Sequence, residues 1–366
     1  MWKWGKRMVL FSNKAECYGC GKCQAACTAG AIAMKEDEEG FWYPLISSDK
    51  CIDCRICRDA CEAIHRMEKR EGKFYAVRCH DEALLHKSTS GGAFSLIAEE
   101  ILKEDGLICG ACMDEKCRVI HRLSNQIDGM RKSKYVQSDI RHIYREMEEE
   151  LKKGRKILFS GTPCQCQAMK DFFSTYEEQL LFVALICRGV QSPRLWEEYL
   201  GYLGKDTSVT FYDFRDKSYC NDAHSVVYQL ENEKHLVPMN EDRFSRLYTK
   251  CLTLRPSCYT CEFCRTDLPF DFTIGDFWGI EKVFPEFADG KGTSLVIARG
   301  ERAENIMGRM QDRAQVISCE EEDCIQPALK VPAKETILRK LLFRDLATVN
   351  ENGHCNMELI LKKYGA

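Results

Sequence analysis

The sequence of 366 residues predicts two successive units, an α+β unit at the N-terminus and a larger α/β unit behind it. The first observation is a cysteine motif that occurs twice between Cys17 and Cys61. The second is an alternation of strand-like and helix-like segments that begins near residue 70 and is typical of α/β units. We expect residues 1–70 to form the first unit, 71–330 the second, and 331–366 a helical tail packed on the second.

Each copy of the cysteine pattern reads C-x2-C-x2-C-x3-C, and the second copy lies 34 residues after the first. This spacing is typical of two-cluster ferredoxins, where three close thiolates hold one 4Fe-4S cluster and the fourth reaches the other cluster. The alternative is a pair of zinc sites, which also use C-x2-C but have no reason to repeat the fourth cysteine. The expected ligand sets are Cys17, Cys20, Cys23 and Cys61 for one cluster, and Cys51, Cys54, Cys57 and Cys27 for the other.

Between the two copies, short apolar stretches at residues 31–34 and 41–45 flank Glu38, Glu39 and Gly40. Two apolar runs separated by a polar turn with glycine predict a β-hairpin. The first unit is therefore expected to be ferredoxin-like.

The composition sets limits on location and partners. Twenty-three cysteines would indicate disulfides only in a short secreted chain, and residues 1–10 lack the apolar run of a signal peptide. The longest apolar stretch, residues 180–187, is less than half of a membrane span. A net charge of −3 gives no basic field for nucleic acid. We expect a cytoplasmic protein of a reducing, oxygen-poor cell, with neither a membrane nor a nucleic acid as partner.

The second unit shows its elements by hydrophobic periodicity. Apolar residues on one face predict helices, and short apolar runs predict buried strands. The helices are expected at residues 93–103 and 142–153, and the strands at residues 74–78, 157–160 and 180–186.

Two cysteines follow the predicted strands of the second unit. Cys164 lies just after residues 157–160, and Cys187 comes directly after residues 180–186. Open α/β sheets bind ligands and cofactors at the carboxyl ends of their strands. Together with the C-x2-C pair Cys258 and Cys261, these cysteines are the candidate ligands of a third cluster.

Alternatives to this third cluster remain open. Cys166 and Cys264 compete as ligands, and ordinary buried thiols explain the same residues without a cluster. The remaining cysteines are interpreted as packing residues: Cys79, Cys109, Cys112, Cys117, Cys220, Cys251, Cys319, Cys324 and Cys355.

A loop of small residues, Lys87-Ser-Thr-Ser-Gly-Gly92, directly precedes the predicted helix at residue 93. Free amides at a helix start favour a phosphate or pyrophosphate, as in a bound flavin nucleotide. An ordinary helix cap explains the loop equally well. A flavin is expected on other grounds, because clusters pass single electrons while organic substrates usually take hydride, and a flavin converts between the two.

Several separated segments resemble one family in the same order. They are residues 87–92, 133–137, 161–165, 187–189, 255–261 and 275–279. The family is the beta subunit of coenzyme F-420 hydrogenases and dehydrogenases, including members fused to an N-terminal ferredoxin. The resemblance implies an FAD-binding protein with a 4Fe-4S cluster beside the flavin. The residues alone leave FMN open as the less expected flavin.

Residue by residue, the resemblance implies flavin-binding and cluster-binding roles. Ser88, Ser90, Gly91 and Gly92 would hold the flavin phosphates, with Gly161 and Thr162 nearby. Cys164, Cys187, Cys258 and Cys261 would hold the third cluster. Asp276 and Trp278 would line the neighbouring pocket, although Trp278 fits a core aromatic at least as well. Arg215 and Lys217 are interpreted as a solvated charge pair, with an anionic substrate tail as the alternative.

We therefore expect an oxidoreductase with two N-terminal 4Fe-4S clusters, a third cluster and FAD. Electrons from ferredoxin or another redox protein would pass through the clusters to FAD and on to a small hydride acceptor, such as coenzyme F-420. The alternatives are a flavin-dependent reductase of another organic substrate, and a non-catalytic relay subunit of a larger redox complex. A partner subunit or a homo-oligomer is compatible with either, and no catalytic side chain is identified.

Overall fold

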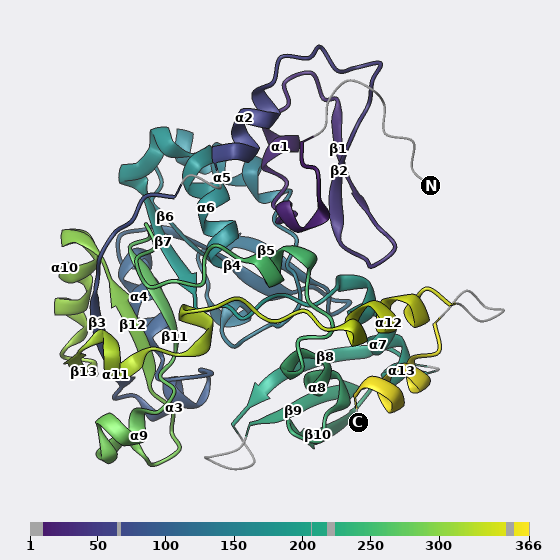
Figure 1. The fold of residues 1–366 in the computed structure, drawn as a ribbon. Coiled ribbons are helices and arrows are strands. Elements are labelled where there is room, and N and C mark those ends of the chain that lie inside the picture. Colours follow the sequence, from purple (N-terminus) through teal and green to yellow (C-terminus); the bar gives the residue numbers. More distant parts are fainter. Residues whose placement is uncertain (1–9, 64–66, 206, 218–223, 349–354, 366) are drawn as a thin grey trace.

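The computed structural model describes residues 10–63, 67–205, 207–217, 224–348 and 355–365. Its mixed α/β architecture with a separate N-terminal unit is seen in Figure 1, where the N-terminal unit lies above the large sheet. Residues 1–9, most of the stretch considered for a leader, and Cys220 lie outside the described residues.

The N-terminal unit contains two short helices and the expected hairpin. Its elements are α1 (Lys22–Ala25), β1 (Ile32–Glu36), β2 (Trp42–Ile46) and α2 (Ile56–Ala63). The two strands pair antiparallel, with Ile32 opposite Ile46. In the turn, the Asp37 carboxylate accepts hydrogen bonds from the amides of Glu39 and Phe41, at 3.1 and 2.9 Å. The ferredoxin-type hairpin prediction is confirmed.

A mixed eight-stranded sheet forms the centre of the second unit. Its strand order is β13-β3-β12-β11-β7-β6-β4-β5. Strands β3, β11, β7, β6 and β4 run in one direction, and β13, β12 and β5 run against them. The bounds are β3 (Lys73–Cys79), β4 (Leu107–Met113), β5 (Val119–Ser124), β6 (Ile157–Gly161), β7 (Leu180–Leu185), β11 (Phe272–Asp276), β12 (Ser294–Ala298) and β13 (Ala314–Cys319).

Helices cover both faces of this sheet. On one face, Leu158 packs in a core with α4 (Ala93–Leu102) and α10 (Gly300–Met310). On the other, Ile157 and Phe159 pack with α5 (Ile143–Lys152) and α6 (Pro163–Phe172). Successive strand residues face opposite cores, which explains why these strands read as unbroken apolar runs. The expected strands and helices of the second unit are confirmed. Short helices α3 (Glu82–His86), α9 (Ile280–Val283) and α11 (Glu321–Cys324) complete this part.

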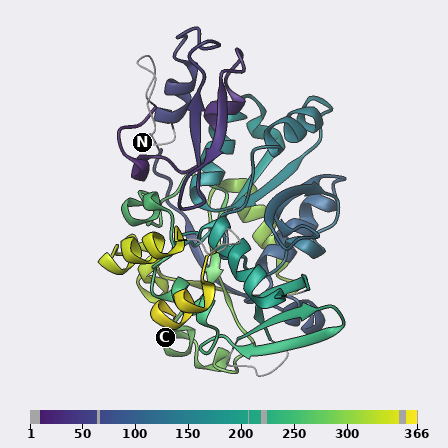
Figure 2. The same ribbon diagram turned by 90° about the vertical axis from the view of Figure 1, so that its right-hand side faces the viewer.

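A second, smaller sheet was not foreseen from the sequence. It has the order β10-β9-β8 and is antiparallel throughout. Trp196, 1% exposed, lies in the core between this sheet, the adjacent helices and the C-terminal helices. In Figure 2 the C-terminal helices, coloured yellow, lie below the N-terminal unit. The bounds are α7 (Pro193–Gly204), β8 (Val209–Asp216), β9 (Ser225–Leu230), β10 (Glu233–Pro238), α8 (Arg243–Thr249), α12 (Ile337–Leu346) and α13 (Met357–Tyr364).

Candidate iron-sulfur and flavin sites

One cavity of the N-terminal unit is lined by four cysteines, and we call it the N-terminal cavity. They are the set expected for one cluster, Cys17, Cys20, Cys23 and Cys61. Two glycines with positive φ, Gly19 at +68° and Gly21 at +75°, bend the chain between the first three cysteines. Only a residue without a Cβ adopts this backbone freely. The tertiary fold then brings Cys61, from α2, to the same cavity.

The second cysteine set of this unit is also partly assembled. Burial raises the pKa of the Cys57 thiol, and the neighbouring Cys27 and Cys51 contribute to the shift. Cys27 also accepts a hydrogen bond from the amide of Ala31 at 3.3 Å, while Cys54 lies exposed. The fold therefore places Cys27, from the first copy, near the second copy, as the crossed ligand arrangement requires.

A second cavity lies at the edge of the large sheet, and we call it the sheet-edge cavity. Its lining includes the four cysteines expected for a third cluster, Cys164, Cys187, Cys258 and Cys261. Cys164 lies in the first turn of α6, and Cys187 follows strand β7. The other two come from the 3-10 helix Pro256–Thr260 and the residue after it. Three separate chain segments thus meet at this cavity.

The cysteines of the sheet-edge cavity are partly buried. Burial raises the pKa of Cys164 and of Cys258 to about 12, and that of Cys187 well above its ordinary value. The Thr162 hydroxyl lies 3.2 Å from the Cys164 sulfur and works against this shift by favouring the thiolate. Metal ligation requires thiolates, so iron binding at these residues must release protons.

The two competing cysteines take different positions. The Cys166 thiol is fully buried and points to the backbone, with its sulfur 3.6 Å from the Gly161 oxygen. Cys264 hydrogen-bonds to Cys261, which lowers the pKa of Cys264. Neither side chain is part of the lining of the sheet-edge cavity, so the structure favours the other four cysteines.

Tyr18 connects the two cavities. Its side chain, between Cys17 and Cys20 in sequence, lines both of them. Its ring packs edge-on against Phe263, with ring centroids 5.4 Å apart. The charge of Cys164 also contributes to raising the pKa of the Cys20 thiol, whose main cause is burial. The N-terminal and sheet-edge cavities are therefore neighbours.

The small-residue loop at residues 87–92 connects helix α3 to helix α4. The Ser90 hydroxyl donates to the Thr293 oxygen at 2.7 Å, and the Gly91 amide donates to the Ser294 hydroxyl at 3.0 Å. A Cβ on Gly91 would lie 2.1 Å from the Val77 oxygen, so only glycine fits there. Gly92, with φ of +88°, is the N-cap of α4. The Ser88 hydroxyl donates to the Leu84 oxygen at 2.8 Å.

Asp276 ends strand β11, and Ser294 pairs with it in the sheet. Asp276 forms an ion pair with Arg215, whose side chain is 13% exposed. The buried Lys217 amine donates to the oxygens of Ser90 and Lys291, both at 2.9 Å. The expectation of a solvated pair at Arg215 and Lys217 is therefore wrong. The end of β8 packs against the loop at residues 87–92, and this contact removes both side chains from water. The sequence positions of the two residues gave no sign of it.

The strand order relates the expected flavin residues to the cysteines. Along the sheet, Ser90 and Gly91 lie beside β12, Asp276 ends β11, Cys187 follows β7, and Gly161 ends β6. These residues thus lie along one sheet edge, with Thr162 and its capping box against Cys164. Trp278 is 61% exposed, so it is not a core aromatic.

Among the described residues, every helix is too short or too polar to span a lipid bilayer. Every described cysteine is free of disulfides. No three Cys, His, Asp or Glu side chains in the described ranges converge tightly enough to hold a single ion. The candidate ligands of each cluster are therefore the cysteines that line one cavity together.

Some candidate residues could not be identified from the sequence. Arg255 reaches from the sheet-edge cavity to Cys17, a contact 238 positions apart that no local pattern signals. Cys319 and Cys324 hydrogen-bond to each other, which lowers the pKa of Cys319. Their spacing of five residues was the available signal, although it spans a strand end and a short helix.

The family comparison agrees with the resemblance found in the sequence. Residues 154–323 match the family described as the C terminus of the coenzyme F-420 hydrogenase/dehydrogenase beta subunit. Residues 16–64 match the 4Fe-4S dicluster domain family. The recognition of this family of beta subunits and of a ferredoxin-type N-terminal domain is confirmed.

Two curated proteins are similar to parts of the chain. One of the subunits of the F(420)H(2) dehydrogenase of Methanosarcina mazei is 24% identical over 188 residues, which are 47% of this chain and 53% of that protein. An uncharacterized ferredoxin of Methanocaldococcus jannaschii is 29% identical over 52 residues, 14% of this chain and 66% of that protein. The chain thus spans about half the length of the first relative.

Among solved structures, the chain is similar to one in a xenon-derivatised F-420-reducing NiFe hydrogenase complex from Methanosarcina barkeri. The sequence identity is 16%, the TM-score is 0.47, and the match covers 79% of this chain and 96% of the other.

Proposed function

Because this chain carries the C-terminal region typical of coenzyme F-420 hydrogenase/dehydrogenase beta subunits behind a 4Fe-4S dicluster domain, we propose that it is an iron-sulfur flavoprotein oxidoreductase. The observation that carries the proposal is the pair of four-cysteine cavities that share Tyr18 in their linings. Two such sites in contact form a path for single electrons.

The residues fit clusters by the chemistry of their donors. Each cavity is lined by four thiols, the number and type of ligands that a 4Fe-4S cluster takes. In the N-terminal unit, Cys61 lies with the first cysteine set and Cys27 lies near the second set. Zinc sites would not need this exchange of the fourth cysteines. Cys17, Cys20, Cys23 and Cys61 would hold one cluster, and Cys164, Cys187, Cys258 and Cys261 another.

The order of the sites follows from burial. Cys54, of the second N-terminal set, is exposed, while Cys17, of the first set, is buried in a core that it shares with the second unit. A redox protein that donates electrons therefore meets the Cys51 set first. The electrons then pass through the Cys17 set to the sheet-edge cavity.

The flavin is proposed for the same sheet edge. When bound, FAD would supply the conversion between single electrons and hydride. The loop of Ser88, Ser90, Gly91 and Gly92 would hold its phosphates at the start of α4. The first amides of the helix would be the donors, because the hydroxyls of Ser88 and Ser90 and the amide of Gly91 already donate within the protein. Gly161 and Thr162 would approach it from the cluster side, and Asp276 would lie between.

The final acceptor is proposed to be a small organic molecule that takes hydride, with coenzyme F-420 as the first candidate. This assignment rests on the names of the family and of the relative from Methanosarcina mazei. A second candidate function is an electron-relay subunit whose partner performs the chemistry. The observation that favours it is that this relative is itself named as a subunit.

Anaerobic purification with analysis of iron, sulfide and flavin tests the proposal. We expect about twelve iron atoms and one flavin per chain, since three 4Fe-4S clusters contain four irons each. About eight iron atoms without flavin would favour the relay function. Zinc in place of iron would overturn both. Oxidation of the reduced holoprotein by coenzyme F-420, followed by its absorbance, tests the acceptor separately.

A further inference from the structure

Arg255 occupies a buried position between the two units. Arg255 is 1% exposed, and its guanidinium contacts Cys17 across the boundary between the two units. The Nε donates to the Cys17 oxygen at 2.7 Å, and one Nη lies 3.6 Å from the Cys17 sulfur. The same residue belongs to the lining of the sheet-edge cavity, and its oxygen accepts a hydrogen bond from the Cys258 amide at 2.9 Å.

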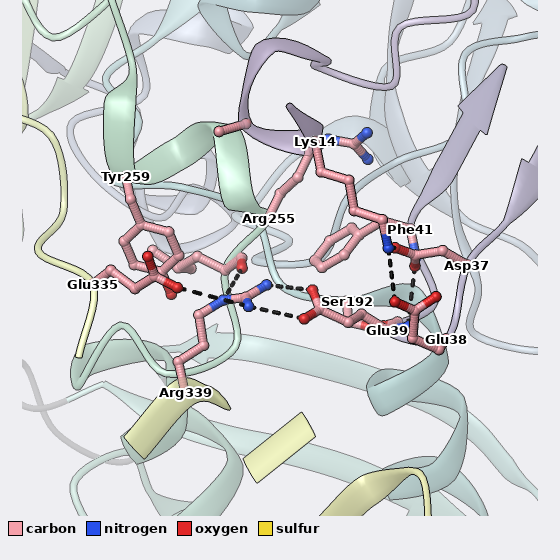
Figure 3. Close-up of polar contacts among 12 residues, drawn as sticks. Lys14, Asp37, Glu38, Glu39, Phe41, Ser192, Arg255, Tyr259, Glu335 and Arg339 are labelled. Atoms are coloured by element: carbon pink, nitrogen blue, oxygen red, sulfur yellow. Dashed lines mark hydrogen bonds and ion pairs between the residues drawn. The ribbon is translucent and has the colours of Figure 1, made fainter. Parts of the chain in front are cut away.

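The surroundings of Arg255 hold it rigidly in this place. Its two Nη atoms donate to the Trp42 oxygen and to the Gln137 amide oxygen, both at 3.0 Å. The guanidinium carbon lies 4.4 Å from the centre of the Tyr43 ring. Figure 3 shows Arg255 beside Phe41, close to the hairpin turn. A Cβ on Gly19 would lie 2.6 Å from an Nη atom, so the loop approaches the guanidinium as closely as glycine allows.

The acceptors of these hydrogen bonds are two carbonyl oxygens, one amide oxygen and the Cys17 sulfur, and none is a carboxylate. A buried cation is costly unless negative charge lies nearby. The Asp37 carboxylate also acts on the guanidinium but is paired with Lys14, so the negative charge in direct contact would come from ligating thiolates, since metal-bound cysteine is deprotonated. The contact with the Cys17 sulfur places the cation directly beside one such thiolate.

On the basis of the proposed function, we propose that Arg255 is a positioning residue that raises the reduction potential of the cluster held at Cys17. Reduction adds one electron to this cluster and makes or breaks no covalent bond. A fixed positive charge and an N–H group directed at a ligand sulfur both stabilise the more negative, reduced state. The electron delivered through the Cys51 set is thereby drawn to the cluster that borders the sheet-edge cavity.

The test is a potentiometric titration of the anaerobic holoprotein, followed by electron paramagnetic resonance. We expect Arg255→Met to lower the midpoint of one N-terminal cluster and to leave the other unchanged. The reduction equilibrium should shift at least about ten-fold, which is 59 mV for one electron. Arg255→Lys keeps the positive charge but not the forked guanidinium, so its midpoint potential should lie between those of the wild-type protein and of Arg255→Met. Arg141→Met is the matched control, because Arg141 pairs with Asp139 and stacks on the Trp42 ring.

Unchanged midpoints in Arg255→Met with full iron content would overturn the inference while leaving the proposed function intact. If this variant loses iron, the wild-type protein labelled with ¹⁵N-arginine is used instead to test the contact between an arginine and the cluster. Pulsed resonance should show nitrogen coupling to one reduced N-terminal cluster, and its absence would overturn the inference. A wild-type protein without clusters would instead contradict the proposed function itself.

Discussion

The guanidinium of Arg339, in helix α12, forms a forked ion pair with the carboxylate of Glu39 in the β1–β2 turn (Figure 3). One of its two contacts measures 2.9 Å, and the Arg339 side chain is only 4% exposed. The Arg339 Nε also donates to the Leu254 oxygen at 3.1 Å, directly before Arg255. The C-terminal tail therefore fixes the hairpin against the segment that carries Cys258.

Glu39→Gln is expected to lower the free energy of unfolding by about 3 kcal/mol, because it leaves the buried Arg339 cation with only the more distant Glu335 carboxylate, at 4.0 Å. The measurement is denaturant unfolding of the holoprotein. Glu38→Gln is the matched control. Glu38 is 65% exposed and pairs with Lys14, so its loss should cost less than about 1 kcal/mol. Equal effects of the two variants would show that the forked pair does not hold the hairpin.

Cys258→Ala is expected to remove about four of twelve iron atoms, because a ligand of the third cluster is lost. Cys166→Ala is the control and should keep all iron, since the Cys166 thiol points into the sheet core. Iron analysis and the resonance spectrum of the reduced protein report both results. Cys264→Ala should also retain the iron. If it loses four atoms while Cys261→Ala does not, Cys264 is the ligand instead.

Lys217→Met is expected to reduce bound flavin at least about five-fold with iron content unchanged. The amine holds the oxygen of Ser90, and its loss leaves buried carbonyl oxygens without a donor. Lys291→Met is the control, because its amine pairs only with the exposed Glu82 in the described residues. Flavin is measured by absorbance after acid release. Full flavin in a folded Lys217→Met protein would exclude this loop as the phosphate site.

His121 predicts an acid-dependent loss of stability. Burial lowers its pKa from 6.5 to about 4, and Nε2 lies 3.0 Å from the Ser160 oxygen. Between these pH values the unfolded chain binds a proton that the folded protein does not. Stability must therefore fall as the pH drops from about 6.5 to about 4, by about 3 kcal/mol in total.

Unfolding of the wild-type protein and of His121→Phe across this pH range tests the effect. The variant should show a flatter profile between pH 6.5 and 4. At pH 8 the histidine is neutral in both states, so the difference measured there reports packing alone. Parallel profiles of the two proteins would assign the acid sensitivity to other groups.

The sequence by itself determined the cysteine sets of the N-terminal unit, because their spacing is covalent and local. It also determined the main strands and helices of the second unit. Neighbouring apolar residues such as Leu158 and Phe159 indicate a strand that is covered on both faces, and the two pack in opposite cores.

Only the tertiary structure decided which distant groups meet. Strand order is not chain order, so Asp276 and Ser90 lie near one another although β3 and β11 are far apart in sequence. Burial likewise depends on packing rather than on residue type, which is why Lys217 lies among carbonyl oxygens instead of in water. The contact between Arg255 and Cys17 joins two segments that are 238 positions apart in sequence, and no local pattern contains it.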